Sequence, residues 1–321
     1  MNKVVHTSLL TVVLAAAVYG IAAAFSGGQD VWQAIISLDP RIWAAILGLS
    51  LFNYLLRYFR WHLYITHKQP LPLTHGQHLA IYIAGFSLTM TPGKAGEAMR
   101  SLYLRQHGVE HHRTMGALFV ERIMDLLTIL MLAGFGASFL DGEQSRLAAI
   151  ITIGLISGCV IIVKMPKKRI IQSRLVQSLP EKLKNLIVFV ENTLDNANDL
   201  LTLRFLLLGL AIGLVAWLCE GYGLFLVMQA FNIEHSTVFL AFAIYGMGIL
   251  LGALSMSPGG LGASELAMAY LLVKAGFDAP SSVAITYICR FATLWFAVVL
   301  GVITMFFMSA LGVTAGKHKE S

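Results

Sequence analysis

Long apolar runs, each close to the length of a bilayer crossing, are the feature that most limits how this chain can fold. A helix rises about 1.5 Å per residue, so roughly 20 apolar residues cross the ~30 Å hydrocarbon layer. Since 57% of the residues are hydrophobic and 12% are charged, the chain has too little polar surface for a soluble domain. We therefore predict an all-α, polytopic membrane protein that forms one integral membrane domain over residues 1–321. Its six predicted spans cover approximately residues 4–26, 42–64, 114–139, 146–164, 203–230 and 281–309.

Two further apolar segments are interrupted by proline and glycine. Residues 78–100 contain "TPGKAG", and residues 238–276 contain "SPGGLG". Proline removes a backbone donor, and in hydrocarbon the freed carbonyls must be satisfied by protein or by a watery cavity. We therefore predict two re-entrant helical hairpins whose breaks line a polar site. The structural residues of the breaks are Pro92, Gly93, Gly96, Pro258, Gly259, Gly260 and Gly262.

The two interrupted segments are alike, which indicates an internal repeat. Each has Ser/Thr-Pro-Gly-x-x-Gly followed by a glutamate, Glu97 or Glu265, and an arginine follows further on, Arg122 or Arg290. Three predicted spans separate the hairpins, an odd number, so one half is expected to be inverted relative to the other. The expected parts are a first half at 1–140, a connecting span and cytoplasmic amphipathic linker at 141–202, and a second half at 203–310.

Basic residues gather on one side of this layout. With a cytoplasmic amino terminus, that side receives the cluster "KMPKKRIIQSR" at 164–174 and the tail residues Lys317 and Lys319, whereas the opposite side receives "DGE" at 141–143. Positive charge on the cytoplasmic side is the usual orientation in membranes, and it attracts anionic lipid. The net charge of +6 therefore needs no nucleic acid partner, and we expect both termini in the cytoplasm.

Several ionisable residues lie far inside the apolar segments. Arg122 and Arg290 lie about eight and nine residues into their predicted spans, a depth of ~12 to 14 Å. An ionised side chain at that depth costs at least ~2.5 to 3.5 kcal/mol unless it is paired or hydrated. We therefore expect these charges to meet in a substrate-binding site. The candidates are Arg57, Arg60, Lys94, Glu97, Arg100, Glu121, Arg122, Asp125, Glu220, Glu265 and Arg290.

Two carboxylates in the third span predict a cation beside them. Glu121 and Asp125 share a helical face at i and i+4, where their repulsion is unfavourable without a positive charge between them. Arg100, Arg122 and Lys94 are available to supply that charge. A buried network of such charges can also lock the two halves together without touching a substrate, and this structural alternative is left open.

The other candidates have predicted partners of their own. Glu97 is a neighbour of Arg100 at i and i+3, and Glu220 is expected to pair with Arg290. Glu265 is expected two turns after the second break, facing Glu97 across a cavity.

Arg57 and Arg60 have a second explanation. They lie near the predicted cytoplasmic end of their span. Arginine at such a depth often extends along the apolar surface to the interface, so the two residues can be membrane anchors.

The motifs resemble a known family. "RYFRW", "TPGKAGEAMRSLYLRQHG", "ERIMDL" and "SPGGLGASELAMAYLL" are similar to the flippase-like membrane domains whose best-known member is the transmembrane region of lysylphosphatidylglycerol synthases. The resemblance covers about residues 4–309 and implies a bacterial or archaeal protein of the cytoplasmic (inner) membrane that moves a lipid across the bilayer. Those synthases continue into a soluble aminoacyl-transferase domain, whereas this sequence ends at "GVTAGKHKES", so lipid synthesis is not implied.

We therefore expect a lipid flippase or transbilayer transporter, not an enzyme, that binds the headgroup of an anionic or aminoacylated phospholipid. One alternative substrate is a polyprenyl phosphate or its sugar-linked form. Another alternative is an intramembrane enzyme that acts on a lipid phosphate with Glu97, Glu121 and Asp125 as acid/base or metal-binding carboxylates.

Membrane lipids are the expected partners, and a homo-oligomer is left open. The sequence has no Walker motif, serine nucleophile motif or dinucleotide loop, so no cofactor is expected. The histidines at 67–78 and 107–113 lack the carboxylate or cysteine spacing of a metal site, so no metal is expected.

Overall fold

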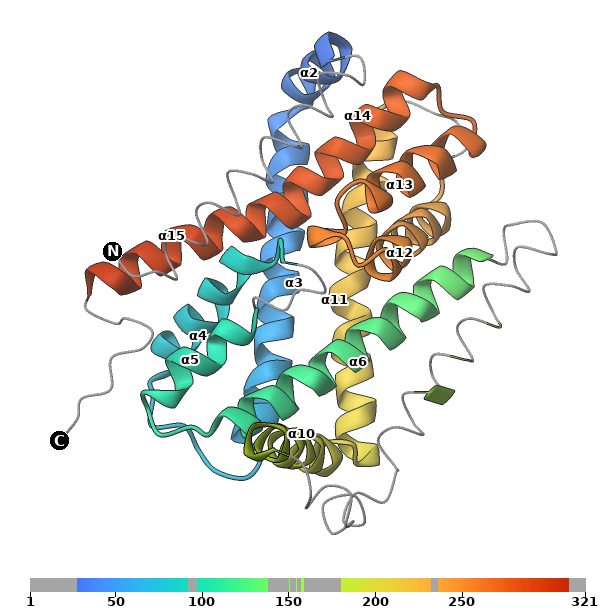
Figure 1. Ribbon diagram of the computed structural model, residues 1–321. Coiled ribbons are helices and arrows are strands. Elements are labelled where there is room, and N and C mark those ends of the chain that lie inside the picture. Colours follow the sequence, from blue (N-terminus) through green and yellow to red (C-terminus); the bar gives the residue numbers. More distant parts are fainter. Residues whose placement is uncertain are drawn as a thin grey trace.

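The computed structural model describes residues 28–91, 97–137, 180–231 and 236–311, with residues 150, 154, 157 and 158 in addition. Every regular element in this part of the chain is a helix, as predicted (Figure 1). In chain order the elements are α2 (Gly28–Ser37), α3 (Pro40–Thr66), α4 (His75–Ala84), η1 (Gly85–Leu88), α5 (Met99–Arg105), α6 (His111–Ala137), α10 (Glu181–Leu200), α11 (Leu203–Ala230), α12 (Val238–Leu254), η3 (Pro258–Gly260), α13 (Ala263–Lys274), α14 (Ala279–Arg290), the π-helical turn η4 (Phe291–Trp295) and α15 (Phe296–Ala310).

Membrane-spanning helices are present where the sequence predicts them. Three continuous helices are long and apolar enough to cross a membrane, namely Pro40–Thr66, Leu203–Ala230 and Ala279–Ala310, the last formed by α14, η4 and α15. The span predicted at 114–139 corresponds to α6, which carries Glu121, Arg122 and Asp125 near its middle. The spans predicted at 4–26 and 146–164 lie almost wholly outside the described residues, so the count of six stays a prediction.

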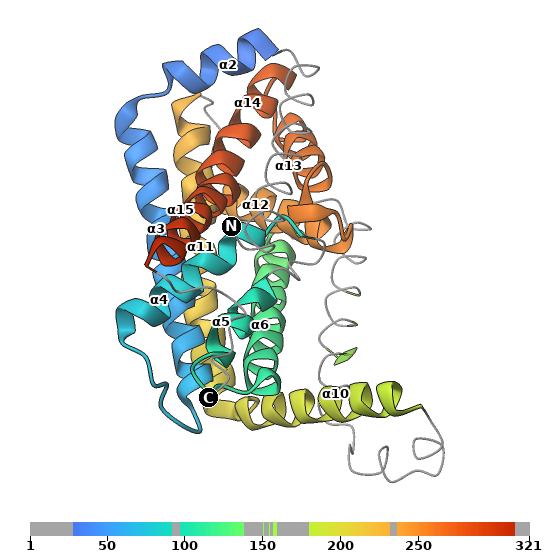
Figure 2. The same cartoon turned by 60° about the vertical axis from the view of Figure 1, so that its left-hand side comes forward.

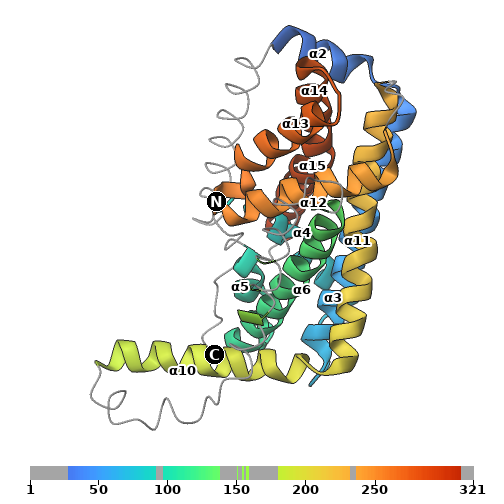
Figure 3. The ribbon, with the colours of Figure 1, turned by 90° about the vertical axis from the view of Figure 1, so that its right-hand side faces the viewer.

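Two long helices, α3 and α11, form the scaffold and run side by side (Figures 2 and 3). α3 begins at Pro40, because proline fits the first helical position and the Asp39 carboxylate accepts a 2.8 Å hydrogen bond from the Arg41 backbone N–H. α10 lies across one end of this pair and α2 across the other (Figure 2). α4, α5 and the start of α6 are near the α10 end, whereas α13 and the start of α14 are near the α2 end (Figures 1 and 2).

The first interrupted segment is a broken helix. α4 starts with a capping box, in which the Thr74 side chain accepts from the Gln77 N–H and the Gln77 side chain accepts from the Thr74 N–H. It tightens into η1, and helical structure resumes at α5. Residues 92–96, which hold Pro92, Gly93, Lys94 and Gly96, lie outside the described residues, so their predicted roles stay predictions.

The second interrupted segment also breaks where predicted. α12 ends at Leu254, the short turn η3 begins at Pro258, and α13 starts at Ala263. The φ angles of Gly259, Gly260 and Gly262 are 63°, 72° and 82°. Left-handed backbone of this kind is accessible to glycine at little cost, which explains why the sequence concentrates glycines in the break.

α10 is amphipathic, and its two ends have different surroundings. Ala197 and Leu200 near its carboxyl end are buried against the helical core, whereas Leu183 and Leu186 near its amino end are exposed. A helix with an uncovered apolar stripe is typical of a membrane interface. Its place on the cytoplasmic side stays a prediction.

Two glycines bring helices of the two halves into close contact. A Cβ atom at Gly246 of α12 would lie 2.7 Å from the Ala133 backbone nitrogen of α6. A Cβ atom at Gly301 of α15 would lie closer still to the backbone of η1, because it would overlap the Ser87 backbone nitrogen and lie 2.8 Å from the Phe86 carbonyl carbon. Thus α6 packs against α12, and α15 packs against α4 and η1.

Substituting Gly301 tests the tighter of these contacts. We expect Gly301→Ala to lower the free energy of unfolding by about 1 to 3 kcal/mol, because the new methyl group meets rigid backbone. Gly48→Ala is the matched control, since a Cβ at that exposed position of α3 meets nothing within 4 Å. Reversible unfolding in mixed micelles measures both changes. Equal stability of the two variants would contradict the packing described for α15.

Candidate functional site

Asp125 of α6 is the centre of a buried ion cluster. Arg57 of α3 donates to its Oδ2 at 2.9 Å, Arg60 of α3 donates to its Oδ1, and Arg122 approaches Oδ2 at 3.2 Å. The indole N–H of Trp217 on α11 donates to Oδ1 at 3.4 Å. One carboxylate therefore holds together α3, α6 and α11 at the level of the cluster.

A second part of the cluster is built on Glu121 and Glu97. Arg100 of α5 donates to both carboxylates at 3.0 Å, and Arg122 lies 3.0 Å from Glu121 and 3.2 Å from Glu97. Arg57 lies 3.6 Å from Glu121 and so joins this part to Asp125. The predicted pair of Glu97 with Arg100 and the predicted cation between Glu121 and Asp125 are both confirmed. The cation is supplied by Arg122 and also by Arg57.

Arg57 and Arg60 are not membrane anchors. Both are buried in the protein and paired with Asp125, so the interpretation that they extend to the interface is wrong. Gly213 of α11 leaves room for Arg60, because a Cβ there would lie 2.8 Å from its Nη1. The guanidinium groups are thus directed toward the helix bundle by a carboxylate and a small neighbour.

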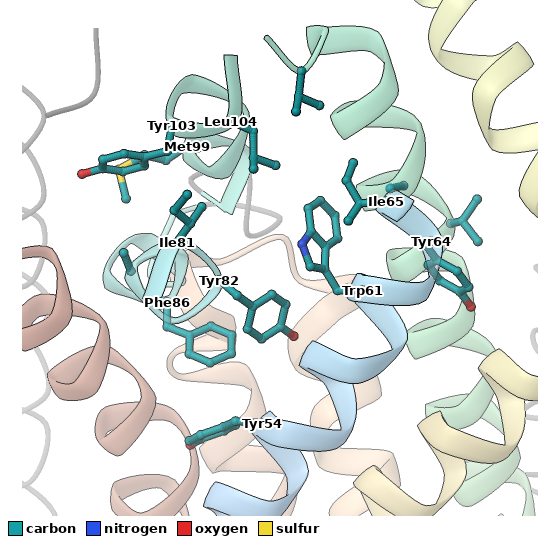
Figure 4. Packing of buried hydrophobic residues seen from close by; sticks show 14 of the residues in the cluster. Tyr54, Trp61, Tyr64, Ile65, Ile81, Tyr82, Phe86, Met99, Tyr103 and Leu104 are labelled. Atoms are coloured by element: carbon teal, nitrogen blue, oxygen red, sulfur yellow. The ribbon is translucent and has the colours of Figure 1, made fainter. Parts of the chain in front are cut away.

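Aromatic rings also contact Arg100, and two of them, Trp61 of α3 and Tyr82 of α4, are labelled in Figure 4. Its guanidinium carbon lies 4.0 Å from the ring centre of Tyr82 and 5.2 Å from that of Trp61. Tyr82 donates to Glu121 at 3.3 Å, and Trp61 donates to the ring of His78 at 2.9 Å. Cation–π contacts of this kind are strongest when water is excluded, so the aromatic layer stabilises the buried charge.

The charges of this cluster do not balance. Four arginines contact three carboxylates, which leaves one positive charge in excess when all the groups are ionised. Arg122 differs from the other members, because its side chain is 26% exposed whereas the others are at most 7% exposed. The excess charge is therefore most accessible at Arg122.

The second half of the chain contributes a smaller group around Arg290. The Arg290 Nε donates to Glu265 at 2.6 Å, and its Nη2 donates to the Gly259 carbonyl at 2.8 Å. Arg290 is the last residue of α14, directly before the π-helical turn η4. It thereby ties this helix to the glycine-rich break between α12 and α13.

The prediction for Glu265 is wrong in its geometry. Glu265 lies in the first turn of α13 rather than two turns beyond the break, because helical structure resumes only at Ala263. Glu265 is not among the residues that line the cavity, whereas Arg290 lines it and donates to the Glu265 carboxylate. Glu265 therefore holds the Arg290 side chain through this hydrogen bond. The predicted pairing of Arg290 with Glu220 stays a prediction.

A cavity of about 430 Å³ brings the two groups of charges together. Its ionisable carboxylates and guanidinium groups come from four helices and from a position two residues before α5, and they are Arg57, Glu97, Arg122, Asp125, Glu220 and Arg290. Apolar side chains of α6, α12 and η4 form much of the remaining wall, among them Leu126, Ile129, Ile249, Leu254 and Leu294. The cavity lining thus combines six carboxylate or guanidinium side chains with many apolar ones.

Sequence reasoning missed several residues of the site. Asn53, Tyr54 and Trp217 line the cavity, and Tyr54 donates to the Thr293 carbonyl at 2.5 Å. A signal was available in α3, where the buried residues Ser50, Asn53, Arg57, Arg60 and Tyr64 recur at intervals of three and four. That spacing places them on one helical face. Arginines on a buried face are distinguished in this way from arginines that anchor a helix at the membrane surface. Trp217 lies three residues before Glu220 and shares its face of α11.

No cluster of three His, Cys, Asp or Glu side chains suited to a metal ion occurs among the described residues. Cys219 and Cys289 are free thiols in the helical bundle. The site is therefore described by its arginines, carboxylates and aromatic rings.

A helical membrane protein with a charged internal cavity is the class that fold and site define. The chain belongs to the family described as the lysylphosphatidylglycerol synthase TM region, whose match covers residues 8–301. A UPF0104 membrane protein, MJ1078, of Methanocaldococcus jannaschii is 25% identical over 224 residues, which are 69% of this chain and 93% of that protein. A UPF0104 membrane protein of Methanothermobacter thermautotrophicus is 21% identical over 324 residues, which cover 93% of this chain and 92% of the relative.

Proposed function

We propose that this protein moves a phosphate-bearing lipid across the membrane by binding its headgroup in the cavity. The observation that carries the proposal is the accessible guanidinium group of Arg122, set in a cluster with an excess positive charge inside membrane-spanning helices. A phosphodiester carries the charge opposite to that of Arg122, and arginine binds it through two parallel hydrogen bonds. The family relationship supports a lipid substrate.

Each side of the cavity has a role in this proposal. Arg122 binds the phosphate, and Arg57 lies next to it on the wall. Glu97 and Glu220, which also line the cavity, accept hydrogen bonds from hydroxyl or ammonium groups of the headgroup. The apolar wall from α12 contacts the glycerol and the first carbons of the chains. A headgroup so held exchanges its hydration for protein contacts, which lowers the barrier to crossing the hydrocarbon.

We further propose that the two halves form an inverted repeat that alternates access to the cavity. The order of long helix, broken helix and long helix occurs twice, as α3, α4–α5 and α6 and as α11, α12–α13 and α14–α15. The packing is exchanged, because α6 contacts the broken helix of the second half and α15 contacts that of the first. Arg122 and Arg290 take corresponding places and both line the cavity. Transporters built in this way change access by moving one half against the other.

This arrangement makes a prediction about topology. A cysteine at Glu110, in the exposed turn before α6, should react with a charged maleimide only from the cytoplasm. A cysteine at Lys274, at the exposed end of α13, should react only from the opposite side. Labelling in intact and permeabilised cells measures both. Reaction of both positions from the same side would contradict the inverted repeat.

Reconstitution tests the proposed function. Purified protein in vesicles should speed the transbilayer movement of a fluorescent or mass-labelled anionic phospholipid relative to protein-free vesicles. A polyprenyl phosphate lipid measured in parallel separates the two substrate classes. Unchanged lipid mass in the receiving leaflet supports transport, whereas a product of altered mass supports the enzymatic alternative. Movement of neither lipid beyond the protein-free rate would contradict the proposal.

A further inference from the structure

The cavity has a mouth at the carboxyl end of α12. Ala253, Leu254, Met256 and Ser257 line the cavity, and the first three of them are exposed. Leu254 is 46% exposed and Met256 is 63% exposed. The accessible edge of the cavity is therefore apolar, whereas its charged groups lie on the other helices.

Several polar groups around this mouth are paired with local partners. The Ser255 hydroxyl donates to the Gly252 carbonyl at 2.7 Å and lies 2.8 Å from the Ser257 hydroxyl. The Ser257 N–H donates to the Ser255 hydroxyl oxygen at 3.2 Å, and the Gly260 N–H donates to the Ser257 carbonyl at 2.9 Å. Irregular backbone is tolerated in hydrocarbon only when its groups are paired in this way. The mouth thus meets the requirement for contact with lipid.

Met256 has an unusual conformation. Its φ angle is 53°, and no other non-glycine residue in the described ranges has a positive φ. A side chain larger than that of glycine is strained there, and such strain gathers at functional positions. Methionine is long, unbranched and flexible, so it can adapt to apolar chains of different shape. The sequence keeps an adaptable apolar side chain at a position where glycine is the less strained choice.

We propose that the mouth formed by Leu254 and Met256 opens to the hydrocarbon of the bilayer and holds the apolar chains of the transported lipid. The inference rests on the proposed function, since it assigns the chains of the same lipid whose phosphate lies at Arg122. The occupant follows from continuity with the cavity, because an aqueous solute needs no apolar mouth whereas a lipid needs one beside its headgroup site. In this proposal, the size of the Met256 side chain determines which apolar lipid chains pass through the mouth.

Thiol reactivity tests the environment of the mouth without any transport measurement. Met256→Cys is introduced into a protein whose native cysteines are replaced by alanine, and the protein is placed in vesicles. We expect a charged methanethiosulfonate reagent to modify this cysteine about tenfold more slowly than a cysteine at Glu110, because a thiol in hydrocarbon does not ionise. A fluorophore attached to it should be quenched by lipids with a nitroxide in the acyl chain rather than by iodide.

Equal rates at the two cysteines, or quenching by iodide alone, would overturn the lipid-facing mouth even if the protein transports lipid. Conversely, the expected reactivity in a protein that moves no lipid would leave the mouth in place and reject the function. The two failures are therefore distinguishable.

A change of size at Met256 tests its role in passage. Met256→Trp narrows the mouth and should slow the movement of a two-chain phospholipid roughly fivefold relative to Met256→Leu, which keeps the size of the side chain. The folded fraction of each variant is measured by size-exclusion chromatography. Equal transport by equal amounts of folded tryptophan and leucine variants would overturn the role of Met256. If the tryptophan variant does not fold, the thiol measurement decides the proposal.

Discussion

Replacing Asp125 by asparagine should lower the free energy of unfolding by about 3 to 5 kcal/mol and leave little folded protein. The Asp125 carboxylate contacts Arg57, Arg60 and Arg122 and is 4% exposed. Without it, four clustered arginines, three of them buried, face two carboxylates, and the positive charges repel one another. Reversible titration with SDS in mixed micelles, followed by circular dichroism, measures the change.

Asp199→Asn is the matched control for this experiment. Asp199 pairs with Lys68, but both side chains are more than 40% exposed, so its loss should change stability by less than about 1 kcal/mol. Adding Arg60→Gln to Asp125→Asn should restore part of the lost stability, because it removes one of the uncompensated charges. Equal stability of the two single variants would mean that the buried cluster does not hold α3, α6 and α11 together.

Arg122→Gln should have the opposite profile, with transport lost and the fold kept. Removing Arg122 leaves three arginines and three carboxylates in the cluster, so the buried charges balance. Its side chain is also the most accessible in the cluster, so its loss leaves no buried gap. We expect a change in unfolding free energy of less than about 1 kcal/mol and a fall in lipid movement of roughly tenfold or more.

Arg105→Gln controls for a general effect of lost positive charge. Arg105 is exposed on α5 and does not line the cavity, so this variant should transport lipid at the wild-type rate. Rates are compared at equal amounts of reconstituted folded protein. If Arg122→Gln unfolds like Asp125→Asn, or transports like Arg105→Gln, Arg122 belongs to a structural network and does not bind the headgroup.

Contacts within one helix were predictable from spacing. Intervals of three and four residues bring side chains together on a helix. They explain why Glu121 and Asp125 share one helical face and why Glu97 pairs with Arg100. The break after α12 follows from the proline and the three glycines that the chain places there. Local geometry alone fixes these features, so one sequence suffices to find them.

Contacts between helices were harder to predict. Arg60 meets Asp125 because α3, α6 and α11 pack closely, and nothing within "RYFRW" specifies that partner. The depth of Arg57 and Arg60 along their span was therefore compatible both with membrane anchors and with members of a buried ion pair. The buried stripe of α3 from Ser50 to Tyr64 favours the ion pair, because it places the arginines on the face that carries Asn53.

The orientation of Glu265 illustrates another limit. The motif places a carboxylate shortly after the break, but whether it faces the cavity depends on where α13 begins. A difference of a few residues in that start rotates Glu265 by a large part of a helical turn. Arg290, 25 positions further along the chain, then takes the place on the cavity wall.

A structure determined in nanodiscs that contain an anionic phospholipid tests the central claim most directly. The account predicts density for a lipid phosphate within hydrogen-bonding distance of the Arg122 guanidinium group, with the chains leaving past Leu254 and Met256. In the Arg122→Gln variant the same density should be absent while the helices keep their positions. Lipid phosphate found only on the outer surface of the helices, with the cavity closed to it in both proteins, would contradict the account.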